Sequence, residues 1–293
     1  MTLDRDALME FAVHAAERAG RYAQDHLGRT EATTKADGSE VTPVDHAVEE
    51  MLRALIAERF PDDAILGEEG AEASAPSERR WIVDPIDGTR AYAHGIPLYA
   101  ITLGLEVDHD MVLGCVHVPA LGETIVATLG AGAYWNGRRA RVSETDDLAA
   151  ARVVTSGLEY WRDWASDRGR AGFDDLVRRC RFARTWGDAY GYVLLATGRV
   201  DVFVDPACGA YWDYGPLLPI LAEAGGRMTT LTGQPLRPWR TLLASNGRLH
   251  DAVRALWGDA RDRDLQSPEV WRRQVDDPTW LGAEDEPPPE EAA

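Results

Sequence analysis

The sequence has few cysteines, and no two of them are spaced as a metal-binding or redox pair. Three cysteines occur in 293 residues, at Cys115, Cys180 and Cys208, and no C-x-x-C motif is present. Secreted proteins of small size use an even cysteine framework, whereas isolated thiols are typical of reduced compartments. We therefore expect a cytoplasmic protein without disulfides.

Basic residues are also scarce. The chain has 31 lysine and arginine residues against 49 aspartate and glutamate residues, which gives a formal net charge of −18. Nucleic acids and anionic membranes bind to basic surfaces, so neither is expected as a partner. A phosphorylated small molecule is not excluded, because bound metal ions can reverse the local charge.

Long apolar runs and a leader segment are missing as well. No apolar run approaches the ~18 residues of a membrane-spanning helix, and residues 1–6 lack the basic and apolar parts of a signal peptide. Residues 130–133 are rich in glycine but lack the G-x-G-x-x-G pattern, so no dinucleotide cofactor is expected. The 45% of hydrophobic residues still suffices for a large core.

The first half, residues 1–147, is predicted to be α+β. Apolar residues at helical spacing predict a helix over residues 3–27. Thr42 and Pro43 are typical of a helix start, where Asp45 would be a capping carboxylate. Alternating or continuous apolar runs predict strands over residues 64–66, 81–83, 98–107, 111–118 and 123–129.

The second half, residues 148–258, alternates strands and helices, which is typical of a layered α/β unit. Pro219 predicts a kink in one of these helices. Strands are expected over residues 152–155, 181–185, 200–204, 227–231 and 241–245, and helices over about 158–180, 188–197, 213–225 and 249–257. Residues 259–293 form a C-terminal extension whose acidic, proline-rich end is predicted to be disordered.

The chain is organised around residues 81–90, which read WIVDPIDGTR. A buried strand is expected to turn at Pro85 and Gly88, leaving Asp84 and Asp87 at its end. Carboxylates in such a place suit hard cations, and a following helix start offers N–H groups to an anion. The alternative is a solvated acidic turn, because short metal motifs often match by chance.

Two further carboxylates are candidates for the same site. Glu68 follows the strand at 64–66 between two glycines, and Asp213 follows Trp212 at a predicted helix start. Taken alone, Glu68 would be a solvent-facing loop residue, and Asp213 would be a first-turn acid that interacts with the helix dipole.

Together, and in this order, these motifs resemble the inositol monophosphatase superfamily of magnesium-dependent phosphomonoesterases. The matching segments are residues 35–42 with Asp45, 67–69, 84–89, 212–213 and 223–226, within a resemblance that spans about residues 5–257. The resemblance implies an α/β fold in which an α+β half and an α/β half form an αβαβα layered sandwich, as in fructose-1,6-bisphosphatases. It also implies a homodimer.

The resemblance implies a site for two or three magnesium ions. Its implied side-chain ligands are Glu68, Asp84, Asp87 and Asp213, joined by the backbone oxygen of Ile86. Magnesium prefers oxygen ligands, and paired metal ions can activate a water and stabilise a leaving alkoxide. Because water would attack directly, no serine, cysteine or histidine nucleophile is expected.

The family pattern also assigns the proton transfer and the phosphate. Thr89 and Asp45 would orient and deprotonate the attacking water, and Glu68 would assist at the metal. The backbone N–H groups of Gly88 and Thr89 would hold phosphate oxygens at a helix start.

The substrate is indicated by residues 184–192, RTWGDAYGY, which resemble the G-D-x-Y-G-Y element of histidinol-phosphatases. Inositol-phosphatase relatives carry a small hydroxyl residue at the position of Asp188, and a carboxylate there favours a cationic alcohol. The alternative for Asp188 is the N-cap of the next helix. Asp205 approximately matches an acidic residue at the far end of the substrate, one residue out of the expected spacing. Tyr214-Gly215-Pro216 also departs from the small residues usual after the metal aspartate.

The sequence therefore predicts a magnesium-dependent phosphatase of a small phosphorylated metabolite. L-Histidinol phosphate, from histidine biosynthesis, is the preferred substrate. Inositol 1-phosphate and an aminocyclitol, sugar or nucleotide phosphate are the alternatives. A binding protein without turnover is disfavoured, because every expected carboxylate is present.

Overall fold

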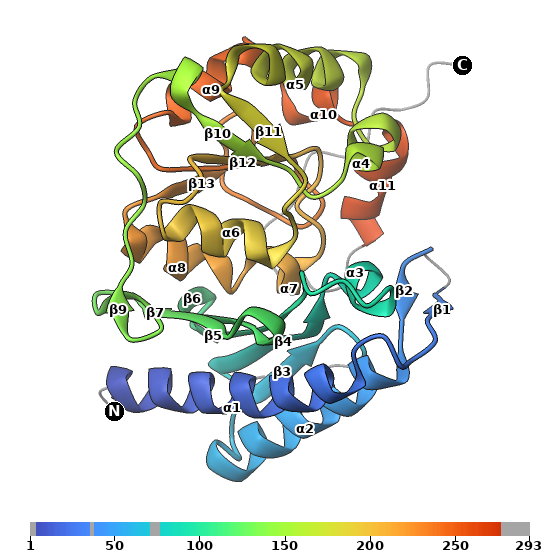
Figure 1. Cartoon of the computed structure of the whole chain (residues 1–293), viewed down its shortest axis with the longest axis vertical. Coiled ribbons are helices and arrows are strands. Elements are labelled where there is room, and N and C mark those ends of the chain that lie inside the picture. The colour runs from blue at the N-terminus through green and yellow to red at the C-terminus, as the bar shows by residue number, and fades with distance from the viewer. Residues whose placement is uncertain (1–3, 36–37, 71–76, 277–293) are drawn as a thin grey trace.

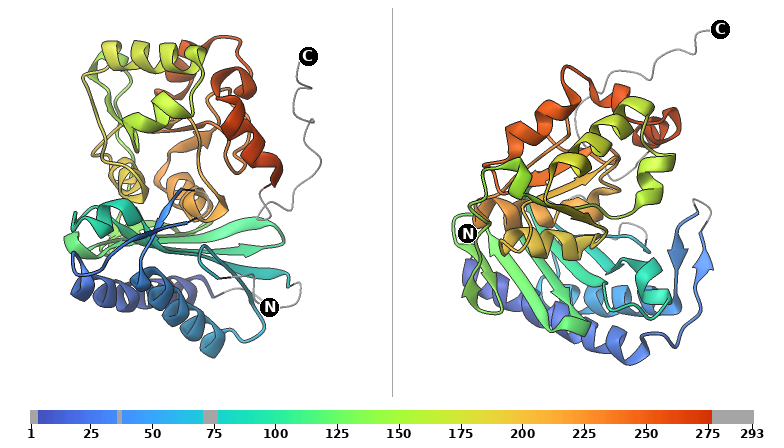
Figure 2. Two further views of the ribbon diagram at one scale, coloured as in Figure 1. Left: turned by 90° about the vertical axis from the view of Figure 1, so that its right-hand side faces the viewer. Right: turned by 45° about the horizontal axis from the view of Figure 1, so that its top comes forward.

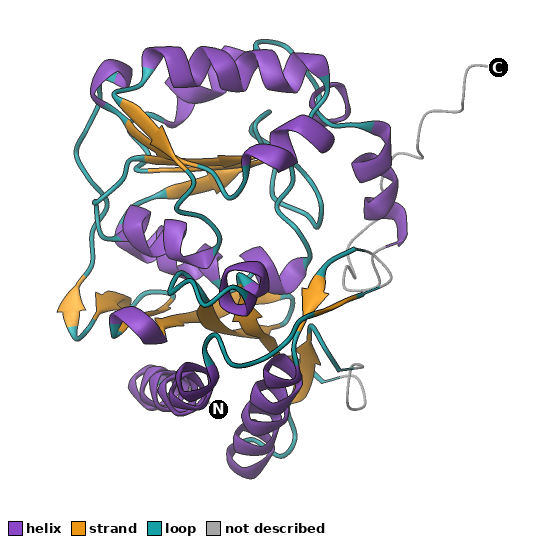
Figure 3. Cartoon of the chain, turned by 45° about the vertical axis from the view of Figure 1, so that its right-hand side comes forward, coloured by secondary structure: helices purple, strands orange, loops and turns teal. Residues whose placement is uncertain are grey.

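The computed structural model describes residues 4–35, 38–70 and 77–276, and these residues form alternating layers of helix and sheet (Figure 1). Helices α1 (Arg5–His26) and α2 (Pro43–Arg59) form the first layer, and both contact the first sheet. The same order of helix, sheet, helix, sheet and helix is visible from the side (Figures 2 and 3). The predicted αβαβα layering is confirmed.

The first sheet has seven strands in sequential order. Strands β3 and β4 are parallel, and every other neighbouring pair is antiparallel. The strands are β3 (Ala64–Gly67), β4 (Arg79–Asp87), β5 (Ala100–Val107), β6 (Asp110–Val118), β7 (Glu123–Thr128), β8 (Gly132–Trp135) and β9 (Arg138–Arg139). A separate ribbon pairs β1 (Thr33–Thr34) with β2 (Glu40–Val41).

Both faces of this sheet are buried. Trp81 and Val83 of β4 pack in the core beneath α1 and α2, whereas Ile82 points to the opposite core, between the two sheets. Successive side chains of a strand point to opposite faces, so a strand covered on both sides needs a continuous apolar run. The run at 81–83 therefore places β4 in the middle of the molecule, where it can hold a site between layers.

The second sheet has five strands in the order β11-β10-β12-β14-β13. Its strands are β10 (Arg152–Val154), β11 (Phe182–Arg184), β12 (Val202–Asp205), β13 (Arg227–Thr229) and β14 (Leu242–Ser245). Helices α6 (Ala189–Ala196) and α8 (Leu217–Ala224) supply side chains to the core that the two sheets share. Helices α5 (Asp167–Arg179) and α9 (His250–Arg254) cover the outer face. The boundary at residue 148 stays a prediction.

The expected turn at Pro85 is wrong. Strand β4 continues through Asp84 and Pro85 to Asp87, with an irregular register against β5 between the two aspartates. A proline cannot donate to a strand ladder and is tolerated at such irregularities. The chain turns only at Gly88, whose φ of 83° suits glycine, before helix α3 (Thr89–Ala93).

Two predicted helices are each broken in two. The helix expected over 158–180 ends as α4 (Leu158–Asp163) and restarts as α5, where Ser166 is the N-cap. The helix expected over 213–225 is split into α7 (Tyr211–Tyr214) and α8. Pro219 does not kink α8, because it lies in the first turn, where its missing N–H has no helical partner.

The chain remains ordered in helices beyond the last predicted one. A 3-10 turn, Ala255–Trp257, ends α9, and α10 (Asp262–Leu265) and α11 (Pro268–Asp276) follow. Short 3-10 turns also occur at Pro119–Leu121 and Leu148–Ala150. The predicted disordered end at 283–293 lies outside the described residues. Among the residues that are described, no helix has the length and apolar character of a membrane span.

Candidate active site

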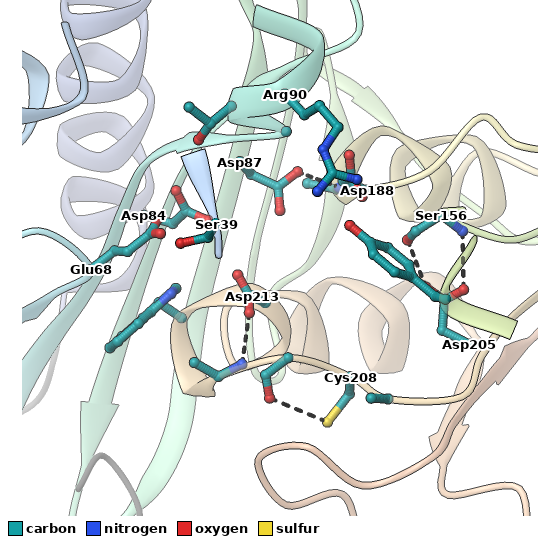
Figure 4. A pocket seen from close by; sticks show the side chains of 18 of the residues that line it. Ser39, Glu68, Asp84, Asp87, Arg90, Ser156, Asp188, Asp205, Cys208 and Asp213 are labelled. Carbon is teal, nitrogen blue, oxygen red and sulfur yellow. Dashed lines mark hydrogen bonds between the residues drawn. The ribbon is translucent and has the colours of Figure 1, made fainter. Parts of the chain in front are cut away.

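A cavity of about 240 Å³ lies where the end of β4, α3, the start of α6 and α7 meet. Its lining comes from both halves of the chain, and Figure 4 shows the acidic side chains that point into it. Every residue that the sequence assigned to the metal or the substrate lines this cavity. Asp45 does not line it, and reaches it through Thr89.

Three carboxylates form the centre of the site. Oxygen atoms of Asp84, Asp87 and Asp213 all lie within 4.8 Å of one another. Burial, followed by the charges of neighbouring carboxylates, raises the pKa of Asp84 and of Asp87 well above the usual range. A donor set made only of oxygens, with its negative charges crowded together, fits a hard divalent cation.

Backbone N–H groups fix each of these carboxylates. Asp84 accepts from the N–H of Ile86 at 3.1 Å, and Asp213 accepts from the N–H of Ala210 at 2.7 Å. Asp87 accepts from the N–H of Ala189 at 2.6 Å, at the start of α6. Because α6 belongs to the second half of the chain, a carboxylate of the first half is oriented by the second.

Glu68 stands beside this cluster with an ammonium group as its partner. The Nζ atom of Lys35 lies 2.9 Å from Oε1 of Glu68 and also bonds Glu69. Burial is the main reason that the pKa of Glu68 is raised to about 7. Lys35 is the only lysine in the sequence. Its position at the site was not predicted, although its uniqueness was visible.

A second glutamate, Glu49 of α2, contacts the backbone of the loop that carries Glu68. This residue was not predicted. Its Oε2 atom accepts from the N–H of Glu69 at 2.8 Å, and its Oε1 atom accepts from Nε of Arg53 at 2.8 Å. An ideal Cβ on Gly67 would lie 2.3 Å from Oε1 of Glu49, so the loop needs glycine there. The available signal was the spacing of four residues from Asp45, which puts both carboxylates on one face of α2.

Asp45 caps α2 and also contacts Thr89, its predicted partner in catalysis. Oδ2 of Asp45 accepts from the N–H and the hydroxyl of Thr42, at 2.9 and 2.6 Å, so the capping role is confirmed. Oδ1 of Asp45 accepts from the hydroxyl of Thr89 at 3.1 Å, and the carbonyl of Ile86 lies 2.9 Å from the same hydroxyl. A carbonyl oxygen has two lone pairs, so Ile86 can still serve a cation.

Asp188 lies at the N-cap position of α6, yet its side chain makes no capping hydrogen bond. Asp188 therefore occupies the predicted N-cap position without capping the helix through its side chain, and Asp87 accepts from the N–H of Ala189. Burial raises the pKa of Asp188, and the nearby Ser156 side chain partly opposes this shift. An ideal Cβ on Gly88 would lie 3.2 Å from Oδ2 of Asp188, so the two positions are neighbours.

Asp205 lies at the end of β12 and lines the same cavity, despite its unexpected spacing. It accepts from the hydroxyl of Thr155 at 2.5 Å and from the N–H and hydroxyl of Ser156 at 3.0 and 2.6 Å. Burial raises the pKa of Asp205 to about 7. The other departure, at residues 214–216, separates α7 from α8 and is not part of the described cavity lining.

Aromatic and charged groups at the outer end of the cavity were not predicted. Arg90 pairs with Glu159 at 3.0 Å and lies 4.0 Å from Glu40, and both Arg90 and Glu40 line the cavity. These groups come from separate loops and short helices, so no local motif joins them. The missed lining residues are Ser39, Glu40, Arg90, Ser156, Tyr160, Trp164, Ala189, Tyr192, Ala207, Cys208, Gly209, Ala210, Trp212 and Trp239.

The chain is similar in sequence to characterised phosphatases. A family model described as the inositol monophosphatase family matches residues 4–260. A histidinol-phosphatase of Chlorobaculum parvum is 38% identical over 264 residues, which cover 87% of this chain and 98% of the relative. A fructose-1,6-bisphosphatase/inositol-1-monophosphatase of Thermotoga maritima is 34% identical over 249 residues, covering 84% and 93% of the two chains.

Solved structures have the same fold. The IMPase of Thermotoga maritima gives a TM-score of 0.77 at 32% identity, covering 92% of this chain and 99% of its own. The extragenic suppressor protein suhB from Bartonella henselae gives a TM-score of 0.80 at 26% identity, covering 87% and 100%. The likenesses in sequence and in structure agree with the acidic cavity described above. The chain is a phosphoric monoester hydrolase that belongs to the inositol monophosphatase family.

Proposed function

We propose that this phosphatase uses magnesium and that its preferred substrate is L-histidinol phosphate. The observation that carries the substrate proposal is Asp188, a carboxylate beside Gly88 and Asp87 that its own helix does not use as a cap. The names of similar relatives support it, since one histidinol-phosphatase is 38% identical and another, from Streptomyces coelicolor, is 37% identical.

Glu68, Asp84, Asp87 and Asp213, with the carbonyl of Ile86, would hold two or three magnesium ions. Bound magnesium would polarise the phosphate and make a water more acidic. Lys35 bonds Oε1 of Glu68 at 2.9 Å, which leaves Oε2 of Glu68 for a cation. Gly88 and Thr89 lie in the cavity at the first turn of α3, where backbone N–H groups are free of helical partners and suit phosphate oxygens.

Thr89 and Asp45 would move the proton of the attacking water. The single hydroxyl proton of Thr89 has two acceptors in range, Oδ1 of Asp45 at 3.1 Å and the carbonyl of Ile86 at 2.9 Å. With the proton directed to Asp45, the Thr89 oxygen would be an acceptor for a water in the cavity. As the water loses its proton to Thr89, the Thr89 proton passes to Asp45. Two hydrogen bonds from Thr42 hold the Asp45 carboxylate in place for this step.

The alcohol end of the substrate would meet Asp188 and Asp205. The two carboxylates would face the ammonium group of L-histidinol. An inositol 1-phosphate activity is the second candidate, because a relative at 34% identity carries inositol-1-monophosphatase in its name. Aminocyclitol, sugar and nucleotide phosphates remain as further alternatives.

Phosphate release from a substrate panel, with magnesium and with EDTA, tests this proposal. The panel contains L-histidinol phosphate, inositol 1-phosphate, fructose 1,6-bisphosphate, 3′-phosphoadenosine 5′-phosphate and an aminocyclitol phosphate. We expect L-histidinol phosphate to lead and Asp188→Ser to lower its lead by about tenfold or more. The matched control is Asp146→Ser, at an exposed loop aspartate outside the cavity.

A lead for inositol 1-phosphate, or an unchanged lead in Asp188→Ser, would refute the substrate assignment. Ligand binding without phosphate release would instead indicate a binding protein. The homodimer stays a prediction, to be checked by light scattering. The cytoplasmic location also stays a prediction.

A further inference from the structure

The part of the chain beyond the family match packs against the outer end of the cavity. The family model ends at residue 260, whereas α10 and α11 extend to Asp276. Figure 1 shows α11 beside α4, which is far from it in the sequence. The N–H of Ser267 donates to the carbonyl of Trp164 at 2.6 Å, directly after α4.

The extension is joined to the junction of α4 and α5 by several contacts. The N–H of Ser166 donates to the carbonyl of Leu265 at 2.9 Å, and Gln266 forms an antiparallel bridge with Ala165. An ideal Cβ on Gly169 would lie 2.2 Å from the carbonyl oxygen of Leu265, so α5 uses a glycine to let the extension approach. The break between α4 and α5 is thus filled by the extension.

The extension also contacts Trp239, another residue of the cavity lining. Its φ of 62° is a left-handed conformation that a bulky side chain rarely adopts. The Gln266 amide donates to the Trp239 carbonyl at 2.6 Å, and the Trp239 N–H donates to Gly209 at 2.7 Å. Such a conformation persists where its surroundings enforce it, and it is concentrated at functional sites.

Arg273 of α11 lies over both tryptophans. Its guanidinium carbon is 5.9 Å from the ring centroid of Trp164 and 5.1 Å from that of Trp239. The two indole rings meet edge to face at 6.2 Å, and Trp164 stacks on Tyr160 with centroids 4.2 Å apart. Tyr160, Trp164 and Trp239 all line the cavity, and we call these three residues the aromatic wall.

We propose that α10 and α11, which lie behind the cavity lining, hold the aromatic wall in a position that selects phosphorylated alcohols bearing a flat ring. The inference rests on the proposed phosphomonoesterase function. A flat, partly cationic heteroaromatic ring gains from contact with aromatic side chains, whereas a small aliphatic alcohol does not. The acidic groups Asp188 and Asp205 lie in the same cavity and add attraction for positive charge.

The test compares kcat/KM for L-histidinol phosphate, which has a ring, with kcat/KM for glycerol 2-phosphate, which has none. We expect Arg273→Ala to lower the ratio about three- to tenfold, through KM for the ring substrate, because the wall loses its cationic support. Arg272→Ala is the matched control, an exposed arginine next to it on α11, and should leave the ratio within about twofold.

A second pair of variants separates selection from folding. Trp164→Ala should lower the ratio by about tenfold or more, and Trp164→Phe should restore most of it, since a ring remains in the wall. Equal losses for both substrates, an unchanged ratio, or a wild-type ratio near one would overturn the inference. If the wild-type chain with magnesium releases phosphate from neither substrate, the proposed function itself fails.

Discussion

The two ends of the cavity, the proposed metal end at Asp84, Asp87 and Asp213 and the proposed alcohol end at Asp188 and Asp205, are built in different ways. At the metal end, Asp84, Asp87 and Asp213 are each held by a backbone N–H. At the alcohol end, Asp205 is held mainly by hydroxyl groups, and the aromatic wall is held by a C-terminal extension. Backbone partners cannot be changed by substitution, whereas side-chain partners can. The difference suggests that the metal end fixes the chemistry and that the alcohol end is free to change its substrate.

Asp87→Asn should break the metal end and have the largest effect. The variant keeps an oxygen that accepts from the N–H of Ala189, but it removes one negative charge from the cation site. We expect kcat with magnesium to fall about a thousandfold or more for every substrate. The matched control is Asp63→Asn, a half-buried aspartate outside the cavity that bonds Trp81. More than about a tenth of the activity in Asp87→Asn would contradict the assigned role.

Glu49→Gln should weaken the metal end without breaking it. The variant removes the charge that pairs with Arg53 and weakens the support of the loop that carries Glu68. Loss of such supporting groups typically costs about ten- to a hundredfold in metal affinity. Calorimetric titration with magnesium measures this loss, and kcat at saturating magnesium should recover. Glu50→Gln, at the exposed neighbour on α2, should bind magnesium like the wild type.

Asp205 should give the alcohol end its own pH dependence. Because burial raises its pKa to about 7, Asp205 is a neutral acid below that pH and an anion above it. The quantity to measure is kcat/KM for L-histidinol phosphate divided by kcat/KM for inositol 1-phosphate. Between pH 6 and pH 8 this ratio should rise about threefold more in the wild type than in Asp205→Asn, because the anion attracts the cationic substrate. Ionisation of the substrates affects the wild type and the variant equally, so it cancels when the two pH profiles are compared. Parallel profiles would show that Asp205 does not meet the cation.

Magnesium should also stabilise the folded chain, with the smallest effect of the four. A cation bound to the native state offsets the burial and the mutual repulsion that raise the pKa of Asp84 and Asp87. We expect the melting temperature to rise by about 5 °C at saturating magnesium. Asp188→Ser, at the alcohol end, should keep this rise, and Asp87→Asn should lose most of it. Differential scanning calorimetry, with EDTA as the reference, distinguishes the two ends.

The gathering of the acidic cluster could be predicted from sequence because most of its residues lie in short motifs. Asp84, Ile86, Asp87, Gly88 and Thr89 are consecutive or nearly so, at a strand end whose apolar run is visible in the sequence. The layered fold could also be predicted, because the spacing of apolar residues indicates strands and helices locally.

The alcohol end could be predicted only in part. Asp188 and Asp205 were found through a resemblance, but the aromatic wall is assembled from α4 and a distant loop. The extension that supports it consists of helices of four and nine residues, too short for a clear apolar period. The breaks at Trp164 and Pro216 were also missed. A tertiary hydrogen bond from Ser267 reaches the Trp164 carbonyl, whereas Gly215-Pro216 is a local helix-breaking signal that was visible in the sequence.

Lys35 offers a single position for selective chemical labelling at the active site. Because Lys35 is the only lysine in the sequence, an amine-directed acylating reagent has one side-chain target. This side chain contacts Glu68 and Glu69. Although burial opposes it, Glu68 and Glu69 raise the pKa of Lys35 and keep its amine protonated and slow to react. A spectroscopic label attached to Lys35 would report on any ligand that changes the position of Glu68.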